Sequence, residues 1–281
     1  MRLSKIKSHA KLNLALNIVG KINNLHIIES IIAFVILHDE IYINKINSNN
    51  HEISFRGKFS KNIKKTNTVS ELLKILDRKK LLKNIKYKII INKNIPIKSG
   101  LGGGSMNAAN ILKFFLRKKI IQITSQEVSN ISKLIGSDVI LGLHSTNSII
   151  NSKNQVKRFS DYKKFYVLIV KPDFGCSTRE IYSKVKEFTK PKFNNPNKKM
   201  FNFKYLKKMS NSLEPIAISK YSKLNEIKSF LVKSVTSDFV RMTGSGSAIV
   251  AYFRSKKRCE NAKKQFRKKY KKYWCMVSKT I

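Results

Sequence analysis

The chain is organised around one stretch, Ile95-Pro96-Ile97-Lys98-Ser99-Gly100-Leu101-Gly102-Gly103-Gly104-Ser105-Met106-Asn107-Ala108-Ala109. Four of the eleven glycines lie between Gly100 and Gly104, so the backbone there can adopt positive φ and approach a ligand closely. The residues before this stretch predict a strand over 87–92, and those after it predict a helix capped by Ser105 or Asn107. A strand, a glycine loop and a helix N-terminus together point N–H groups at an anion, so we predict a phosphate-binding loop.

Two common nucleotide-binding motifs do not match this loop. The P-loop requires a lysine directly after its last glycine, and here Ser105 follows Gly104. The dinucleotide fingerprint G-x-G-x-x-G requires a different spacing from that of Gly100, Gly102 and Gly104. From the loop alone, a flexible glycine turn between a strand and a helix remains the alternative.

The composition predicts a globular protein with a very basic surface. Hydrophobic residues make up 42% of the 281 residues, and 58 Lys and Arg against 16 Asp and Glu give a formal net charge of +42. Such a charge is typical of proteins that bind nucleic acid, an anionic membrane or an acidic substrate, but the lysines are scattered, so we interpret most of them as solvated surface. The densest basic stretch, 256–272, places Cys259, Ala262, Phe266 and Tyr270 at helical spacing, which predicts a helix with one buried face.

The cysteines and the hydropathy favour a cytoplasmic protein. Cys176, Cys259 and Cys275 show neither a disulfide framework nor a metal-binding spacing, which fits a reducing compartment. No apolar run reaches the roughly 18 residues that a membrane span requires. We therefore expect no membrane partner, and a monomer or a homodimer.

Three ordered motifs resemble the GHMP small-molecule kinases. The run 96–109 resembles their Pro-x(3)-Gly-Leu-Gly-(Gly)-Ser-Ser-x-Ala-Ala loop, the segment 10–16 (AKLNLAL) resembles their first motif, and 242–247 (MTGSGS) resembles their third. The resemblance implies an α+β, two-lobed fold: an N-terminal lobe like domain 2 of ribosomal protein S5 over 1–155, and an α/β C-terminal lobe over 156–281. The doubled glycine before the serine is most similar to the branch of the family that acts on 4-diphosphocytidyl-2-C-methyl-D-erythritol.

This resemblance implies an ATP-dependent kinase of the non-mevalonate route to isoprenoid precursors, with magnesium as the second cofactor. The phosphoryl acceptor would be the 2-hydroxyl of 4-diphosphocytidyl-2-C-methyl-D-erythritol. Ser105 is the nearest candidate contact for the metal ion. The resemblance assigns two residues beside adenine, Asn67 and Lys93, and the following residues of the loop to ATP: Pro96, Lys98, Ser99, Gly100, Leu101, Gly102, Gly103, Gly104 and Ser105.

Lys11 and Asp138 are the candidate catalytic residues. A lysine within a strand-like alternation is uncommon, and an aspartate in the apolar segment 135–143 requires a partner, because burying an unpaired carboxylate is costly. From the pattern alone, Lys11 could face solvent and Asp138 could cap a helix. The resemblance implies that Asp138 accepts the proton of the attacking hydroxyl, while Lys11 lowers the pKa of that hydroxyl.

The candidate substrate-binding residues follow from the resemblance too. They are Asn13, His26, Thr178, Tyr182 and Gly244. His26 matches the histidine that recognises cytosine and Tyr182 matches an aromatic residue that stacks on it, although Tyr182 could equally be a core aromatic. The chain departs from the family pattern at five positions: Asn24, Leu25, Met106, Asn107 and Ile140.

The sequence leaves two other functions open. One is another GHMP kinase, acting on mevalonate or homoserine, and the other is a degenerate, basic RNA-binding homologue.

The sequence also predicts the remaining secondary structure. The expected strands cover 8–18, 30–36, 40–43, 165–170 and 249–253, with a short strand within 48–65. The expected helices are one starting at 66–73 with Thr68 and Glu71 as a capping box, one over 124–135, and one starting at 211–215, and a Pro-, Asn- and Lys-rich loop is expected over 189–202.

Overall fold

The computed structural model describes residues 4–23, 25–160 and 164–281, so Asn24 lies outside the described residues. The chain forms two compact units that alternate along the sequence. Unit 1 contains the residues up to Ala10, Leu37–Ile97 and Gly102–Ser145, and unit 2 contains Lys11–Ile36, Lys98–Leu101 and Thr146–Ile281. The lobe boundary expected near residue 155 stays a prediction.

Two long paired strands, β1 (Ser4–Ile22) and β2 (Leu25–Ile46), contribute to both units. The sequence predicted two separate strands over 30–36 and 40–43, and this was wrong, because β2 continues through His38 and Asp39. The polar residues do not end the strand, since the buried carboxylate of Asp39 accepts hydrogen bonds from the backbone N–H groups of Asn94 and Ile95. An internal hydrogen bond removes most of the cost of a buried polar group.

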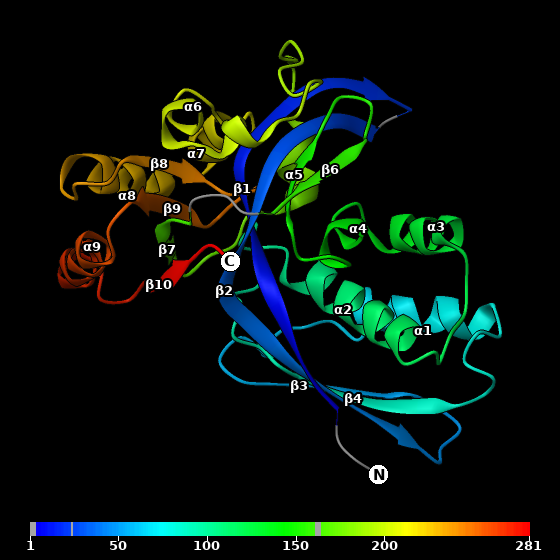
Figure 1. Cartoon of the computed structure of the whole chain (residues 1–281). Coiled ribbons are helices and arrows are strands. Elements are labelled where there is room, and N and C mark those ends of the chain that lie inside the picture. The colour runs from blue at the N-terminus through cyan, green and yellow to red at the C-terminus, as the bar shows by residue number, and fades with distance from the viewer. Residues whose placement is uncertain (1–3, 24, 161–163) are drawn as a thin grey trace. The chain divides into compact units, whose positions relative to one another are not determined.

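In unit 1, helices cover one face of a sheet (Figure 1). Strand β3 (Glu52–Arg56) pairs in parallel with β4 (Lys86–Asn92), and β4 pairs antiparallel with residues 40–46 of β2. The helices are α1 (Thr68–Arg78), α2 (Gly103–Arg117), α3 (Ser125–Ile135) and α4 (Val139–Gly142). Their apolar faces form one core with β4, to which Ile89, Ile91, Leu112 and Phe115 belong.

Unit 2 is built on an antiparallel sheet in the order β10-β7-β9-β8. These strands are β7 (Tyr166–Lys171), β8 (Phe239–Met242), β9 (Ile249–Phe253) and β10 (Trp274–Lys279). Strands β5 (Asn147–Ile150) and β6 (Val156–Phe159) extend from residues 30–32 of β2. The helices are α5 (Thr178–Ser183), the 3-10 turn η1 (Lys198–Phe201), α6 (Phe203–Lys207), α7 (Glu214–Lys220), α8 (Ser222–Lys233) and α9 (Lys256–Lys269).

Two helix starts differ from the sequence-based expectation. Helix α1 is capped by Asn67 with Ser70, not by Thr68 with Glu71, because the Thr68 hydroxyl donates to the Gly104 carbonyl oxygen at 2.8 Å. Helix α2 begins at Gly103, with Gly102 as the N-cap at φ +71°, and neither Ser105 nor Asn107 caps it. A left-handed glycine turns the chain directly into the helix, and the first N–H groups of α2 are left without a side-chain cap.

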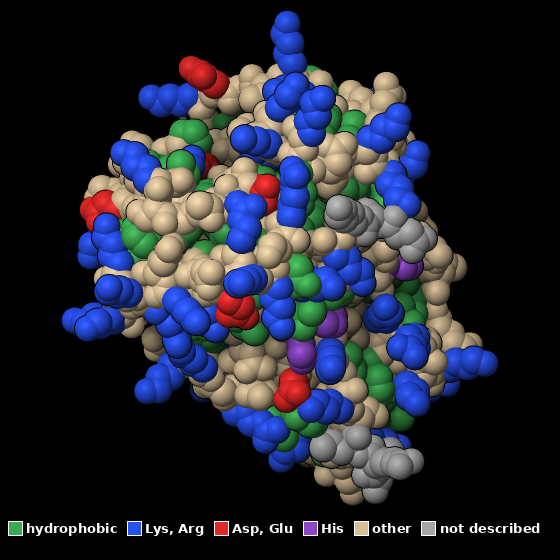
Figure 2. All heavy atoms as spheres, turned by 60° about the vertical axis from the view of Figure 1, so that its left-hand side comes forward, with side chains coloured by type: hydrophobic (Ala, Val, Ile, Leu, Met, Phe, Trp, Pro, Cys, Tyr) green, Lys and Arg blue, Asp and Glu red, His purple; other side chains and the backbone are tan. Residues whose placement is uncertain are grey.

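The basic residues are dispersed. Figure 2 shows Lys and Arg side chains over most of the visible face of the molecule, with few acidic ones among them. The predicted helix over the densest basic stretch is confirmed as α9, whose residues Cys259, Ala262 and Phe266 are buried in the core of unit 2. All three cysteines are free and buried. Among the described residues, no helix is both long enough and apolar enough to cross a bilayer.

We expect the core around α2 to carry much of the stability of unit 1. Leu112 is fully buried, and truncating a buried leucine loses apolar contacts and leaves a cavity. Leu112→Ala should lower the free energy of unfolding by about 2–5 kcal/mol, as measured by urea denaturation. Leu134→Ala removes the same atoms from a side chain that is 70% exposed, so it should change that free energy by less than about 0.5 kcal/mol. Equal losses would contradict this assignment of the core.

Candidate active site

The predicted site residues are divided between the two units. Unit 1 holds Asn67, Lys93, Pro96, Gly102, Gly103, Gly104, Ser105 and Asp138. Unit 2 holds Lys11, Asn13, His26, Lys98, Ser99, Gly100, Leu101, Thr178, Tyr182 and Gly244. Each unit therefore presents its own set of candidate residues.

In unit 1, the glycines form a helix start that excludes side chains. A Cβ atom on Gly103 would lie 3.1 Å from Ile95 Cγ2 and 3.2 Å from Lys93 Nζ, and a Cβ on Gly104 would lie 3.2 Å from Thr68 Oγ1. The first N–H groups of a helix have no intrahelical acceptor, and the helix dipole places positive charge at this end. Because the first turn of α2 also lacks acidic residues, this end suits a phosphate group.

The two residues expected beside adenine have local partners. The Asn67 side chain accepts hydrogen bonds from the Val69 and Ser70 N–H groups and donates to the Lys64 and Lys65 carbonyl oxygens. Asn67 therefore shapes the start of α1, and its contact with adenine stays a prediction.

Lys93 pairs with Asp39, a fully buried carboxylate that the sequence analysis missed. The sequence signal that could have found Asp39 is the one that identified Asp138, an aspartate beside apolar residues. Asp39 is also an aspartate next to an apolar run, in a chain with few acidic residues, and it requires a partner for the same reason. The role of Lys93 beside adenine stays a prediction as well.

Asp138 lies directly before the short helix α4 and is half-buried. Its side chain makes no capping hydrogen bond to that helix, so the structure does not support the helix-capping alternative. The family proline is replaced by Ile140, which lies within α4.

In unit 2, Lys11 and Asn13 are joined on β1. Lys11 is only 4% exposed, so it does not face solvent, and its Nζ donates to Asn13 Oδ1 at 2.7 Å. Asn13 Nδ2 in turn donates to the Ser30 hydroxyl at 2.8 Å, and that hydroxyl donates to the Ala15 carbonyl oxygen. This chain of hydrogen bonds holds the ammonium group of Lys11 in one orientation.

The loop segment 98–101 packs directly on the third motif. The Ser247 and Ala248 N–H groups donate to the carbonyl oxygens of residues 98 and 99. A Cβ on Gly100 would lie 2.0 Å from the Thr243 carbonyl oxygen, so only glycine fits there, and its φ of +74° favours glycine as well. Thr243 Oγ1 also accepts a hydrogen bond from the Asn13 N–H group at 3.0 Å. Residues 98–101 of the loop, the first motif and the third motif therefore meet in unit 2.

The candidate base-recognition residues also meet. The rings of His26 and Tyr182 lie 5.3 Å apart between centroids, and the hydroxyls of Thr178 and Ser245 lie 2.9 Å apart. Burial, with a smaller contribution from the positive charge of Lys21, lowers the pKa of His26 below 6.5, so the ring is neutral at neutral pH. Leu25, which replaces the family aromatic residue, is exposed.

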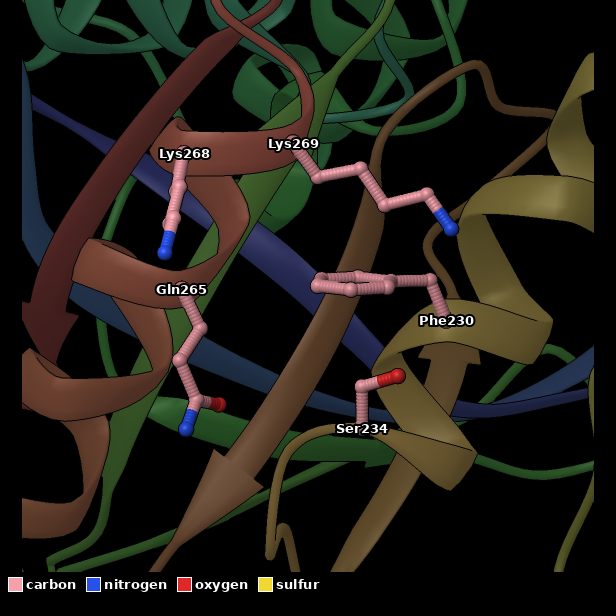
Figure 3. Close-up of a pocket in the computed structure, with 5 residues that line it drawn as sticks. All are labelled: Phe230, Ser234, Gln265, Lys268 and Lys269. Atoms are coloured by element: carbon pink, nitrogen blue, oxygen red, sulfur yellow. The ribbon is translucent and has the colours of Figure 1, made fainter.

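A separate hollow on unit 2 lies between α8 and α9 (Figure 3). Phe230 and Ser234 face Gln265, Lys268 and Lys269 across it, and the Lys269 ammonium lies 4.9 Å from the centre of the Phe230 ring. None of these five residues is among the predicted site residues.

Comparison with known proteins identifies relatives over the whole chain. Residues 67–148 match the GHMP kinases N terminal domain, and residues 185–272 match the GHMP kinases C terminal domain. The 4-diphosphocytidyl-2-C-methyl-D-erythritol kinase of Pelagibacter ubique is 54% identical, with both chains covered in full. The enzyme of that name from Clostridium tetani is 32% identical over 99% of this chain and 100% of its own.

Solved structures of related kinases share the fold. A 4-(cytidine 5'-diphospho)-2C-methyl-D-erythritol kinase superposes with a TM-score of 0.79 at 18% identity, covering 99% of each chain. An L. major mevalonate kinase superposes with a TM-score of 0.72 at 13% identity, covering 99% of this chain and 95% of its own. These matches confirm the α+β, two-lobed fold that the sequence predicted.

The lowered pKa of His26 can be measured directly. In an NMR titration, the His26 ring should protonate with a midpoint below 6.5, because burial and the charge of Lys21 both disfavour its charged form. Lys21→Gln should raise the midpoint toward 6.5, whereas Lys264→Gln, which changes a lysine that does not act on His26, should leave it unchanged. A midpoint above 6.5 in the unmodified protein would contradict this account of the ring.

Proposed function

Because the chain belongs to the GHMP kinase family, we propose that it transfers the γ-phosphate of ATP to the 2-hydroxyl of 4-diphosphocytidyl-2-C-methyl-D-erythritol, in the non-mevalonate route to isoprenoid precursors. The chain is an ATP-dependent small-molecule kinase. The observation that carries the choice of substrate is the 54% identity, over the full length of both chains, to an enzyme named for that substrate.

The phosphates of ATP are assigned to the glycine loop. The α2 N-terminus offers free N–H groups and the positive end of a helix dipole, and glycines keep side chains away from it. Phosphoryl transfer requires mainly that donor and acceptor be held in line and that developing charge be stabilised. A rigid, side-chain-free anion site serves both requirements.

Asp138 is assigned as the proton acceptor and Lys11 as the group that favours ionisation of the attacking hydroxyl. A carboxylate takes the proton as the new O–P bond forms, and an ammonium close to the hydroxyl lowers its pKa. The hydrogen bond from Lys11 Nζ to Asn13 Oδ1 supports this role, because it orients the ammonium without neutralising its charge.

The cytidine end of the substrate is assigned to His26, Tyr182, Thr178 and Asn13, with Gly244 nearby. A neutral imidazole can both donate and accept a hydrogen bond, as reading the edge of cytosine requires. Tyr182 offers an aromatic face for stacking and lies beside His26. Gly244 places no side chain beside Asn13, since a Cβ atom there would lie 3.5 Å from Asn13 Oδ1.

Magnesium is assigned to the phosphates, with Ser105 as the protein contact. Among the described residues there is no group of three His, Cys, Asp or Glu side chains that could hold a metal ion. A single hydroxyl from Ser105 fits magnesium, which is commonly held by substrate phosphates and water with few protein ligands. When bound, the ion would neutralise charge on the transferred phosphoryl group.

The alternatives are less well supported. Mevalonate and homoserine kinases share the fold, but their structures are only 13–15% identical to this chain, so the likeness concerns the fold alone. An RNA-binding homologue would be favoured by the charge of +42, but the basic residues are spread along the sequence and over the face that Figure 2 shows. We propose the cytoplasm as the site of the reaction, since three free cysteines fit a reducing compartment.

A substrate panel tests the proposed function. ADP release in the presence of ATP and magnesium should depend on 4-diphosphocytidyl-2-C-methyl-D-erythritol, and mevalonate and homoserine should not replace it. Release with mevalonate or homoserine instead would reassign the enzyme within the family. If no alcohol supports release and RNA binds with a steep salt dependence, the kinase proposal is wrong.

Asp138→Asn tests the proposed proton acceptor. The amide cannot take the proton, so kcat should fall by about 10²–10⁴-fold, while the dissociation constant of ATP in a binding titration should change less than about twofold. Asp77→Asn is the matched control, because Asp77 is also a carboxylate of unit 1 and pairs with Lys86 at 2.7 Å. It should keep wild-type kcat, and near-normal turnover of Asp138→Asn would remove Asp138 from the mechanism.

A further inference from the structure

We propose that Asp39 is a positioning residue for the phosphate loop, whose single carboxylate fixes the chain on both sides of the glycines. This inference deepens the proposed function and rests on it, because it assigns Asp39 to ATP binding in the kinase reaction. Asp39 lies in β2, within unit 1, and its side chain is 0% exposed.

One carboxylate oxygen holds the turn that enters the loop. Asp39 Oδ1 accepts hydrogen bonds from the backbone N–H groups of Asn94 and Ile95, each at 2.8 Å. These residues follow β4 and directly precede Pro96, at the start of the glycine stretch. Because backbone groups donate both hydrogen bonds, the carboxylate fixes the path of the chain itself.

The other oxygen holds the helix that leaves the loop. Asp39 Oδ2 accepts a hydrogen bond from Asn107 Nδ2 at 3.0 Å and pairs with the Lys93 ammonium. Asn107 lies in the second turn of α2 and is 1% exposed. Ile95 and Asn107 are twelve residues apart in the sequence, and the four glycines of the loop lie between them. One carboxylate thus fixes the chain on both sides of it.

The charges at this point favour a role in anion binding. Lys93 is 4% exposed, and its Nζ lies 3.2 Å from the position that a Cβ of Gly103 would occupy. An ammonium beside the positive end of a helix is unfavourable unless a negative charge compensates it. Asp39 supplies that charge from the interior, which leaves the N–H groups of the α2 N-terminus for a phosphate.

The Asn107 side chain indicates that its hydrogen bond to Asp39, which we call the tether, serves more than stability. Its Oδ1 atom is buried and has no hydrogen-bond partner among the described residues. An unpaired buried acceptor destabilises the folded state, so an apolar side chain of similar size would suit this place better. The amide is therefore best explained by its other end, the Nδ2 group that ties α2 to Asp39.

Two substitutions test the proposal. Asp39→Asn replaces one carboxylate oxygen by an NH2 group, which then faces other hydrogen-bond donors and should displace the phosphate loop. It should raise the KM for ATP about tenfold or more, since small displacements of a binding group are costly.

Asn107→Leu removes only the tether to α2. It should raise the KM for ATP several-fold while the melting temperature stays near or above that of the wild type. Both variants should leave the KM for 4-diphosphocytidyl-2-C-methyl-D-erythritol within about twofold.

Asn110→Leu is the matched control. Asn110 lies on the same helix and is also buried. Its Nδ2 donates to the Met106 carbonyl oxygen at 2.9 Å and to the Ser8 hydroxyl at 3.4 Å, and within the described part of the chain it makes no hydrogen bond to Asp39. Its KM for ATP should match that of the wild type. The proposal is overturned if Asn107→Leu binds ATP normally, or if Asn110→Leu weakens ATP binding as much as Asn107→Leu does.

A direct titration with a non-hydrolysable ATP analogue separates this proposal from the choice of substrate. If the wild type binds the analogue but phosphorylates none of the alcohols, the proposed function fails while the role of Asp39 is still measured. In that titration the dissociation constants of Asp39→Asn and Asn107→Leu should rise in parallel with the KM values. If Asp39→Asn does not fold, Asn107→Leu alone decides the outcome.

Discussion

The close approach of the Gly100 backbone to Thr243 and Gly244 is the constraint on which the candidate site of unit 2 depends. A side chain at residue 100 would collide with the Thr243 carbonyl oxygen, so this packing exists only with glycine. The contact places the loop segment 98–101 against the third motif, and the hydroxyl of Thr243 extends the arrangement to Asn13 on β1. Backbone packed on backbone leaves little room for adjustment, which suits a site that must hold its geometry.

Buried polar side chains then fix the segments around this contact. Asn211 Nδ2 donates to the Met242 and Gly244 carbonyl oxygens, and a Glu214 carboxylate oxygen accepts from the Met242 N–H group. The segment 211–215, where the sequence predicted a helix start, thus supports the third motif. Arg241 is likewise buried, and its guanidinium donates to the backbone carbonyl oxygens of Leu14, Leu206 and Met209. For each of these side chains, the hydrogen bonds to backbone groups offset the free-energy cost of burying a polar group, and they also hold the backbone in place.

Most elements could be predicted because their signals are local. The strand over 87–92, the helix over 124–135 and the buried face of α9 follow from hydrophobic periodicity within one segment. The failures occurred where a distant residue decided the outcome. Strand β2 continues because Asp39 finds donors after β4, and α1 is capped by Asn67 because Thr68 is bound to Gly104.

The sequence by itself determined the glycine-rich stretch, the family and the fold, because glycine positions, motif order and periodicity are written in the chain and need no knowledge of contacts. Only the tertiary structure decided which polar residues support one another. The partners of Asp39 lie more than fifty residues away, and Asn13 meets Thr243 from the far end of the chain. Hydrogen bonds between such distant segments leave no periodic trace, since each depends on the geometry of both strands or helices that carry it.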